Sequence, residues 1–350
     1  MKSPDMTRKA VQAAIVAAAL AAVASCEHKD LCFDHDPHAP KSEASVEAAY
    51  EQEWQYDYDG QTDWAGYAEW QQSFGMDYDD LRPSVPGGLR VVTYTTGAVA
   101  STDNTGPYGG NVWMRPGEHS LLMYNNDTEY IVFSDIDSFA SARATTRTRT
   151  RNTYMGSQYA DGGKENTVSA PDMLYASYTP SYTLERKPGI GVLHADMRPL
   201  VFTYLVRYEF AHGLEYVALA RGALAGMAEA VWLNSGRTSE QTATVLYDCT
   251  LHTFGAQAKV RSFGVPDFPN SHYQTHAAHR YGLNLEVRLK NGKMKSFDFD
   301  VTDQVQAQPQ GGVIVVKGIS ISDAEGTEGG SGFDVSVDGW GDYEDIDLPL

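Results

Sequence analysis

Short runs in which apolar and polar residues alternate recur along most of the chain, and glycine, proline and asparagine separate them. β-Branched and aromatic residues dominate these runs, whereas long helical periodicity is scarce. The pattern is typical of antiparallel strands in a β-sandwich rather than of alternating strands and helices. The runs that we expect to form strands are 89–96, 111–115, 119–125, 128–134, 200–210, 214–226, 229–233, 242–249, 258–264, 311–322 and 333–340.

The clearest local signal is the segment LNLEVRLKNGKMKSFDFDV, in which Asn291 and Gly292 separate two alternating runs. An Asn-Gly pair between such runs predicts a hairpin with a type I′ turn. We expect one face of the hairpin to enter the core, and this face carries Leu283, Leu285, Val287, Leu289, Phe297, Phe299 and Val301. The following residues, VTDQVQAQ, predict one short helical turn.

Nine aromatic residues crowd residues 50–78, with no Lys or Arg between Lys41 and Arg82. Asp63 is a candidate N-cap of a helix through Phe74 that ends at Gly75. The stripe can pack on the first sandwich, which is the commoner use of such a pattern. Alternatively, aromatic faces can stack on sugar rings, and the candidate residues of such a ligand platform are Trp54, Trp64, Tyr67 and Trp70.

Arginine and threonine alternate from Thr146 to Arg151, which in a strand places Arg147, Arg149 and Arg151 on one face. We interpret this stretch as a polar sheet edge that resists unwanted pairing. An arginine-rich loop open to an extracellular protease is the alternative.

Residues 1–26 have the pattern of a bacterial lipoprotein signal. Lys2, Arg8 and Lys9 precede an apolar run from Ala13 to Ala24, and small residues lead to Cys26. An apolar helix of about 15 residues reaches only ~23 Å, short of a ~30 Å hydrocarbon core. We therefore expect residues 1–25 to be removed and Cys26 to be lipidated, so that the exported protein is tethered to a membrane by its acyl chains.

Composition excludes several partners. Residues 1–25 hold three basic residues and one acidic residue, so the remainder carries 24 basic and 45 acidic side chains, a net charge of -21. Such a charge repels nucleic acid and anionic lipid headgroups, so we expect neither as a partner.

Candidate chemistry is sparse. His272, His276 and His279 have a spacing that would face one zinc ion on a helix, but nearby prolines favour a solvated loop, so we expect no metal. Cys32 and Cys249 either pair in an oxidising envelope or leave Cys249 as a buried thiol. Hydrolase, zincin and nucleotide-binding motifs are absent from the sequence. We expect neither a cofactor nor an enzyme.

Several segments together resemble a family of Bacteroidetes lipoproteins that carry a domain of unknown function. That family is related to the anchor and accessory subunits of the fimbrillin superfamily. The segments are CEHKDLC at the lipid site, GGNVWMRPGEHSLLMYNNDTEYIVF (109–133), ARGALAGMAEAVWLNSG (220–236), FDFDVTDQV (297–305) and VDGWGDYEDIDL (337–348).

The resemblance implies two transthyretin-like β-sandwich domains in tandem, held by lipid at the outer membrane and exposed at the cell surface. It also implies no known catalysis, and fimbrial partners bound by β-strand exchange. We accordingly expect a signal peptide at 1–25 and a tether at 26–45, an N-terminal sandwich at 46–190 with the aromatic insertion, and a C-terminal sandwich at 191–350. The function expected is fimbrial anchoring, accessory assembly or adhesion. A glycan-binding surface lipoprotein is the alternative.

Overall fold

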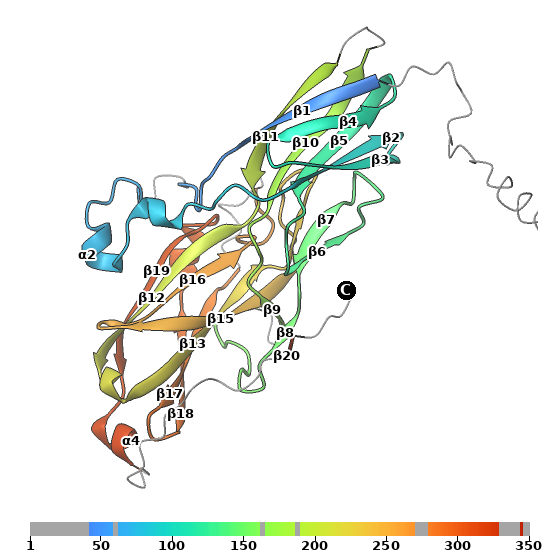
Figure 1. Cartoon of the computed structure of the whole chain (residues 1–350). Coiled ribbons are helices and arrows are strands. Elements are labelled where there is room, and N and C mark those ends of the chain that lie inside the picture. The colour runs from blue at the N-terminus through green and yellow to red at the C-terminus, as the bar shows by residue number, and fades with distance from the viewer. Residues whose placement is uncertain are drawn as a thin grey trace, which may run out of the picture. The chain divides into compact units, whose positions relative to one another are not determined.

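The computed structural model describes residues 42–58, 62–161, 165–185, 190–269, 279–328 and 344–345. Contacts group residues 41–350 into one compact unit. Strands dominate it (Figure 1), which confirms the prediction of an all-β fold. No helix in these ranges is both long and apolar enough to span a bilayer. The helical elements are α2 (Trp70–Phe74), α3 (Thr302–Gln306), α4 (Asp323–Thr327), and the 3-10 turns η1 (Tyr78–Leu81) and η2 (Leu214–Tyr216).

A seven-stranded sheet folds over to form a first β-sandwich, with the strand order β3-β2-β5-β10-β11-β1-β4. β1 runs parallel to β11 and antiparallel to β4. Apolar side chains from both halves meet in one core, including Val46, Leu121 and Met197. The strands are β1 (Ser42–Tyr50), β2 (Leu89–Thr95), β3 (Ala98–Thr105), β4 (Gly109–Met114), β5 (Gly117–Asn125), β10 (Tyr175–Leu184) and β11 (Gly191–Pro199).

A second sandwich has the strand order β18-β17-β13-β15-β16-β12-β19, with β9 paired to β15. β15 belongs to both layers, because its first part pairs with β13 and its end pairs with β16. The strands are β9 (Asn166–Ser169), β12 (Phe202–His212), β13 (Val217–Ala228), β15 (Thr242–His252), β16 (Gly255–Ser262), β17 (Gly282–Leu289), β18 (Met294–Asp300) and β19 (Gly312–Ser320).

A small third sheet joins the two sandwiches. It has the order β14-β7-β6, with β6 (Ile131–Ser134), β7 (Arg143–Thr146) and β14 (Ala230–Trp232). Its apolar residues share a core with Val92 and Leu122 of the first sandwich and with Phe263, which follows β16 of the second. The two sandwiches are therefore packed together through a common apolar layer.

Three strands of the first sandwich lie in segments where sequence reasoning did not expect strands. β1 begins within the expected tether, and β10 and β11 lie between residues 151 and 200, where no strand was expected. The proposed domain boundary at residue 191 falls on the first residue of β11, which pairs with β1 and β10. The division of the chain into two domains stays a prediction.

The arginine-threonine stretch is only partly an edge. Arg149 lies in β8 (Arg149–Thr150), which pairs with β20 (Glu344–Asp345). Arg151 is buried: its guanidinium lies 3.6 Å from the Glu286 carboxylate and donates to the carbonyl of Gly222 at 3.1 Å. A buried, paired guanidinium is not accessible to a protease, so the structure disfavours the protease-loop interpretation at this residue.

The hairpin of β17 and β18 is present, and its predicted core residues Leu283, Leu285 and Val287 are fully buried. The turn differs from the prediction, because only Gly292 has a positive φ, whereas a type I′ turn needs one at Asn291 as well. Gly292 instead donates to the carbonyl of Leu289 at 2.8 Å, and the amide of Leu289 donates to the carbonyl of Lys293. This is a type I turn followed by a glycine bulge.

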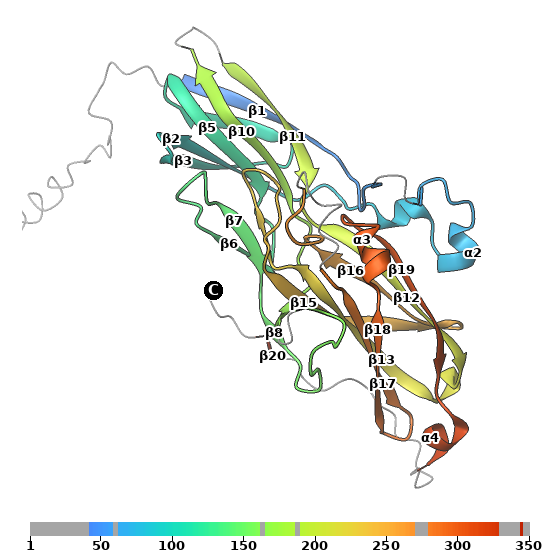
Figure 2. The ribbon, with the colours of Figure 1, turned by 180° about the vertical axis from the view of Figure 1, so that it is seen from behind.

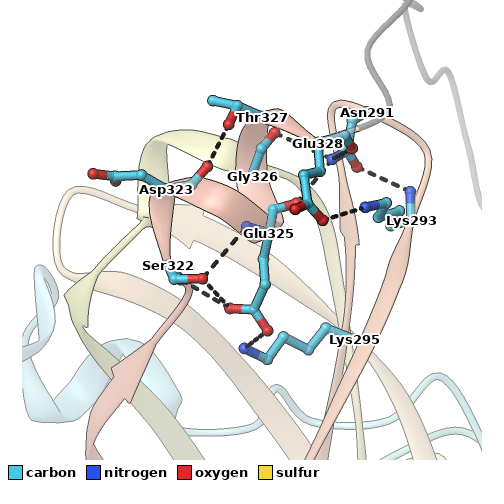
Figure 3. Close-up of polar contacts among 9 residues, drawn as sticks. All are labelled: Asn291, Lys293, Lys295, Ser322, Asp323, Glu325, Gly326, Thr327 and Glu328. Carbon is cyan, nitrogen blue, oxygen red and sulfur yellow. Dashed lines mark hydrogen bonds and ion pairs between the residues drawn. The ribbon is translucent and has the colours of Figure 1, made fainter.

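A tertiary contact explains this turn. The Asn291 side chain donates to the carbonyls of Glu325, Gly326 and Glu328, at 2.9 to 3.2 Å, and so holds α4 against the hairpin tip (Figure 3). Ser322 and Glu325 form a capping box at the start of α4. Lys295 adds an ion pair to Glu325 at 2.7 Å.

The Glu325–Lys295 contact predicts an acid-resistant attachment of α4. The hydrogen bond from Lys295, followed by those from Ser322, lowers the pKa of Glu325 from 4.5 to about 2. A depressed pKa contributes stability that is present above the unfolded value and lost as pH falls through the folded value. NMR titration of the Glu325 carboxyl should therefore give a midpoint near 2 in the parent and a midpoint raised toward 4.5 in Lys295→Met. Equal midpoints would contradict the assignment.

Candidate functional site

The four residues of the predicted platform come together, but mostly in the interior. Trp54 and Trp70 are 1% and 5% exposed, and their ring centroids lie 5.9 Å apart in an edge-to-face arrangement. Trp64 and Tyr67 are partly buried against the same cluster. Two of the four rings therefore present no face to solvent on which a sugar could stack.

The cluster packs on the second sandwich rather than on the first, where packing was expected. Its core partners are Leu205 of β12 and Val313 of β19, and Figure 1 shows α2 beside these strands. The helix begins at Trp70 instead of near Asp63, whose carboxylate accepts from the amide of Gly66 in a turn. It ends at Gly75 in the left-handed conformation, as predicted. The chain thus leaves the first sandwich after β1, crosses the second, and returns to β2.

The predicted histidine site is only partly within the described residues. His272 and His276 lie outside them, and Nδ1 of His279 lies 3.6 Å from the Asp161 carboxylate. A different group, His212, Glu215 and Asp323, brings its ligand-type atoms within 4.8 Å of one another. All three are exposed, and Asp323 already accepts hydrogen bonds from His212 and Tyr216. This group stabilises the start of α4, and its sequence spacing gives no signal.

The predicted lipidation site, Cys26, and Cys32 also lie outside the described residues. Cys249 lies in β15, half-buried, and is a free thiol. Burial raises its pKa well above the ordinary range, with a smaller contribution from the charge of Asp248. A thiol with a raised pKa is a poor nucleophile, so Cys249 is suited to packing rather than to chemistry.

An open seam between β10 and β11 is the feature that sequence reasoning missed. These consecutive strands pair only at Tyr175–Pro199 and Ala176–Arg198, within the part of the chain that the structure describes. Beyond this point Ser177–Leu184 pairs with β5 alone and Gly191–Met197 pairs with β1 alone. We call these two stretches, with the space between them, the β10–β11 seam. At its far end side chains fill the space: a Cβ at Gly191 would lie 3.1 Å from Leu184 Cδ1.

The opposite corner of the same sandwich is closed by side chains. β4 is the last strand there, and its neighbour across the corner is β3. Ser101 of β3 donates to the carbonyl of Trp113 at 3.1 Å, and the Asp103 carboxylate accepts a hydrogen bond from the Trp113 backbone. Polar side chains of β3 therefore occupy the backbone groups of Trp113 that an added strand would need.

A polar cleft of about 700 Å³ lies at the base of the seam. Its lining includes charged residues of both signs and two tyrosines: Glu51, Tyr56, Tyr178, His194, Asp196 and Arg198. Burial, and then the nearby charge of Glu51, raises the pKa of Tyr56, so its hydroxyl stays protonated. Mixed donors and acceptors of this kind suit the backbone and polar side chains of an extended segment better than an apolar ligand.

Prolines and charges hid these strands in the sequence, because TPSYTLERKPGIG resembles a loop. The sequence did contain one signal for a strand here, which is the alternation of apolar and polar residues in β11. Leu193, Ala195 and Met197 are buried, and the residues between them are exposed. A strict period of two over nine residues is the pattern of a half-buried strand.

Comparisons with known proteins found a matching family model and a curated relative. A family model described as Domain of unknown function (DUF5119) matches residues 71–248. A Bacteroides ovatus protein, provisionally named fimbrium anchoring subunit Fim4B, is 22% identical over 307 residues, which span 79% of this chain and 88% of the relative. These matches agree with the family resemblance stated from the sequence.

A solved structure shares the fold. The crystal structure of a protein from Bacteroides ovatus, provisionally described as an adhesin, gives a TM-score of 0.57 at 19% identity and covers 85% of this chain and 96% of that chain. The fimbrial anchor protein Mfa2 of Porphyromonas gingivalis gives a TM-score of 0.42 at 12% identity, over 79% of this chain and 90% of that chain. The first score supports a common fold, and the second is too low to support a further conclusion.

Replacing one buried ring tests whether the aromatic cluster is interior packing. Trp70→Ala should lower the free energy of unfolding by about 3–5 kcal/mol, because it leaves a cavity between α2 and β12. Chemical denaturation measures this change. Met155→Ala is the control, since Met155 is 84% exposed and its truncation should change stability by less than about 0.5 kcal/mol. Unchanged stability in Trp70→Ala, together with loss of a bound saccharide, would favour the platform.

Proposed function

This chain belongs to the DUF5119 family, and on that premise we propose that it is a non-catalytic subunit of a cell-surface fimbrium that acts in anchoring, accessory assembly or adhesion. The fimbrium relative from Bacteroides ovatus supports this proposal because it matches most of the chain. The single structural observation that carries it is the β10–β11 seam, which leaves two strand edges of the first sandwich without a strand between them.

The seam is suited to binding an extended segment of another subunit. Unpaired strand edges offer rows of backbone donors and acceptors, and a strand that adds there gains main-chain hydrogen bonds. Apolar residues of such a strand would face the core beside Leu193 and Ala195, and its polar residues would face the cleft beside Asp196 and Arg198. Fimbrial partners are therefore proposed to bind by strand exchange at this position.

The location is proposed from the sequence pattern before Cys26. Removal of residues 1–25 and lipidation of Cys26 would tether the protein to the outer membrane, with the sandwiches at the cell surface. The net charge of -19 for the whole chain is consistent with a protein that binds neither nucleic acid nor anionic lipid headgroups.

A non-catalytic role is proposed because the sequence carries no hydrolase, zincin or nucleotide-binding motif and the relatives are named for attachment. A glycan-binding surface lipoprotein was the alternative. Its proposed platform includes Trp54 and Trp70, whose burial between α2 and the second sandwich leaves them unavailable for stacking. No observation in the described residues favours that alternative over strand binding.

Closing the seam covalently tests this proposal. In Leu184→Cys/Gly191→Cys the two substituted positions lie close together at the far end of the seam, because a Cβ at Gly191 would lie 3.1 Å from Leu184 Cδ1. Oxidation or a short bis-thiol reagent can therefore join the two thiols. The lipoprotein is isolated in detergent from outer membranes and used as bait, and captured proteins are identified by mass spectrometry. We expect the reduced form to capture fimbrial subunits and the closed form to lose them.

The reduced form of the same variant is the matched control, because it differs only in the cross-link, which peptide mapping verifies. Capture of fimbrial subunits by both forms would show that partners bind elsewhere on the protein. Capture by neither the parent nor the reduced form would overturn the fimbrial function itself.

A further inference from the structure

β19 is the last strand of its sheet, yet its outer edge is occupied. It pairs with β12 in parallel, in the register Leu205↔Val313 and Arg207↔Val315. In a parallel pair, alternate residues direct their backbone groups to opposite sides of a strand. The backbone N–H and C=O groups of Val313 and Val315 point away from β12, to the side on which a further strand would add.

Two glutamine side chains occupy that side. The Gln308 amide accepts from the N–H of Val313 at 2.7 Å and donates to its carbonyl at 2.9 Å. The Gln304 amide accepts from the N–H of Val315 at 2.8 Å and donates to its carbonyl at 3.1 Å. Each side-chain amide therefore makes both hydrogen bonds that a residue of a neighbouring strand would make.

The spacing of the two glutamines matches the strand. Gln304 lies in α3, and Gln308 follows one turn later, so four residues advance about 6 Å along the helix axis. Val313 and Val315 are two residues apart, which is about 6.6 Å along a strand. One helical turn thus presents two amides at the repeat of a β-ladder, and Figure 2 shows α3 beside β19.

Neighbouring groups fix the orientation of Gln308. Trp64 of the aromatic cluster donates its indole N–H to Gln308 Oε1 at 2.7 Å, and Gln308 Nε2 also donates to the carbonyl of Gln304 at 3.0 Å. A Cβ at Gly312 would lie 2.0 Å from Gln308 Oε1, so only glycine leaves room for the amide there. Trp64 is therefore a positioning residue for this contact.

We propose that Gln304 and Gln308 take the place of a missing strand and prevent a second copy of this chain from adding to β19. The hydrogen bonds alone support the first half of this inference. The second half rests on the proposed function, in which the β10–β11 seam is the surface that accepts a partner strand and β19 must not accept one. One accepting surface lets a subunit bind one partner strand, as a terminal or accessory position in a polymer requires.

The partner that is excluded at β19 is a second copy of this chain. Every molecule would carry the same uncovered edge, and two such edges could pair with each other. Val313, Ile314, Val315 and Val316 form an apolar, β-branched run, which is the composition that pairs edge to edge when uncovered. The other edge strand of this sandwich, β18, instead carries Lys295, Asp298 and Asp300 along its length. These charged side chains disfavour edge-to-edge pairing, so β18 needs no covering side chain.

The test replaces the amides with an apolar group of similar size in the full chain. Gln304→Leu should accelerate hydrogen exchange of the Val315 amide, and Gln308→Leu that of the Val313 amide, roughly tenfold or more in each case. The double variant should also self-associate with rising concentration in sedimentation velocity, beyond the parent. Gln306→Leu is the matched control, because Gln306 lies in α3 but donates to the carbonyl of His279 instead of to β19.

The single variants keep the proposal testable if the double variant does not fold, because each should expose only its own valine. Exchange at Val313 and Val315 that equals the parent in both variants would overturn the assignment. Faster exchange without added association would overturn the claim that the amides keep copies apart. Neither result depends on capture of fimbrial subunits, so this inference and the proposed function fail separately.

Discussion

Unpaired backbone groups at the ends of a sheet are the constraint on which this structure depends. An all-β protein built from open sheets must satisfy or shield an N–H and a C=O at every other residue of each edge strand. Here the solutions differ from edge to edge. Side chains of β3 bond to Trp113 of β4, two glutamines bond to β19, and charges line β18. Only between β10 and β11 do two strand edges separate without such a cover among the described residues.

The aromatic cluster contributes to the same arrangement. Its rings shield the outer face of β12 and β19, and its Trp64 reaches the glutamine that covers the edge of β19. The third sheet has a comparable role on another face, where its apolar residues fill the space between the two sandwiches. Packing and edge cover are therefore linked, since a loss of the rings would also release the side-chain amide that replaces a strand.

Sequence reasoning predicted the fold best where burial on one face imposes a period of two. β17, with Leu283, Leu285 and Val287 buried, is the clearest example. It missed β3, whose sequence AVASTDNT is a polar edge, and it missed β10 because Pro180 and the charges after Leu184 resemble a loop. The turn at Asn291 was assigned from local preference, which takes no account of the hydrogen bonds that its side-chain amide shares among three carbonyls near α4.

The candidate site was less predictable for a physical reason. The seam exists because two consecutive strands diverge, and the edge cover exists because the chain after α3 folds back so that Gln304 and Gln308 reach β19. The residues involved are close in sequence, but neither a divergence of strands nor a side-chain amide on a strand edge has a characteristic residue period. The aromatic residues were recognised as a cluster, but a sequence cannot show which sheet they cover. Trp54 and Trp70 contact the second sandwich through Leu205 and Val313, more than 100 residues away in sequence.

The position of β1 has a mechanical consequence. β1 follows the N-terminal segment directly, and it is hydrogen-bonded on both sides, to β11 in parallel and to β4 in antiparallel, over most of its length. Interstrand hydrogen bonds lie across the strand axis. A tension applied at Ser42 along that axis therefore loads both ladders in shear, so that many bonds must break together rather than one after another. With the anchor proposed at Cys26, a pull on the protein would reach the fold at this strand, and the shear geometry would resist unfolding under that pull.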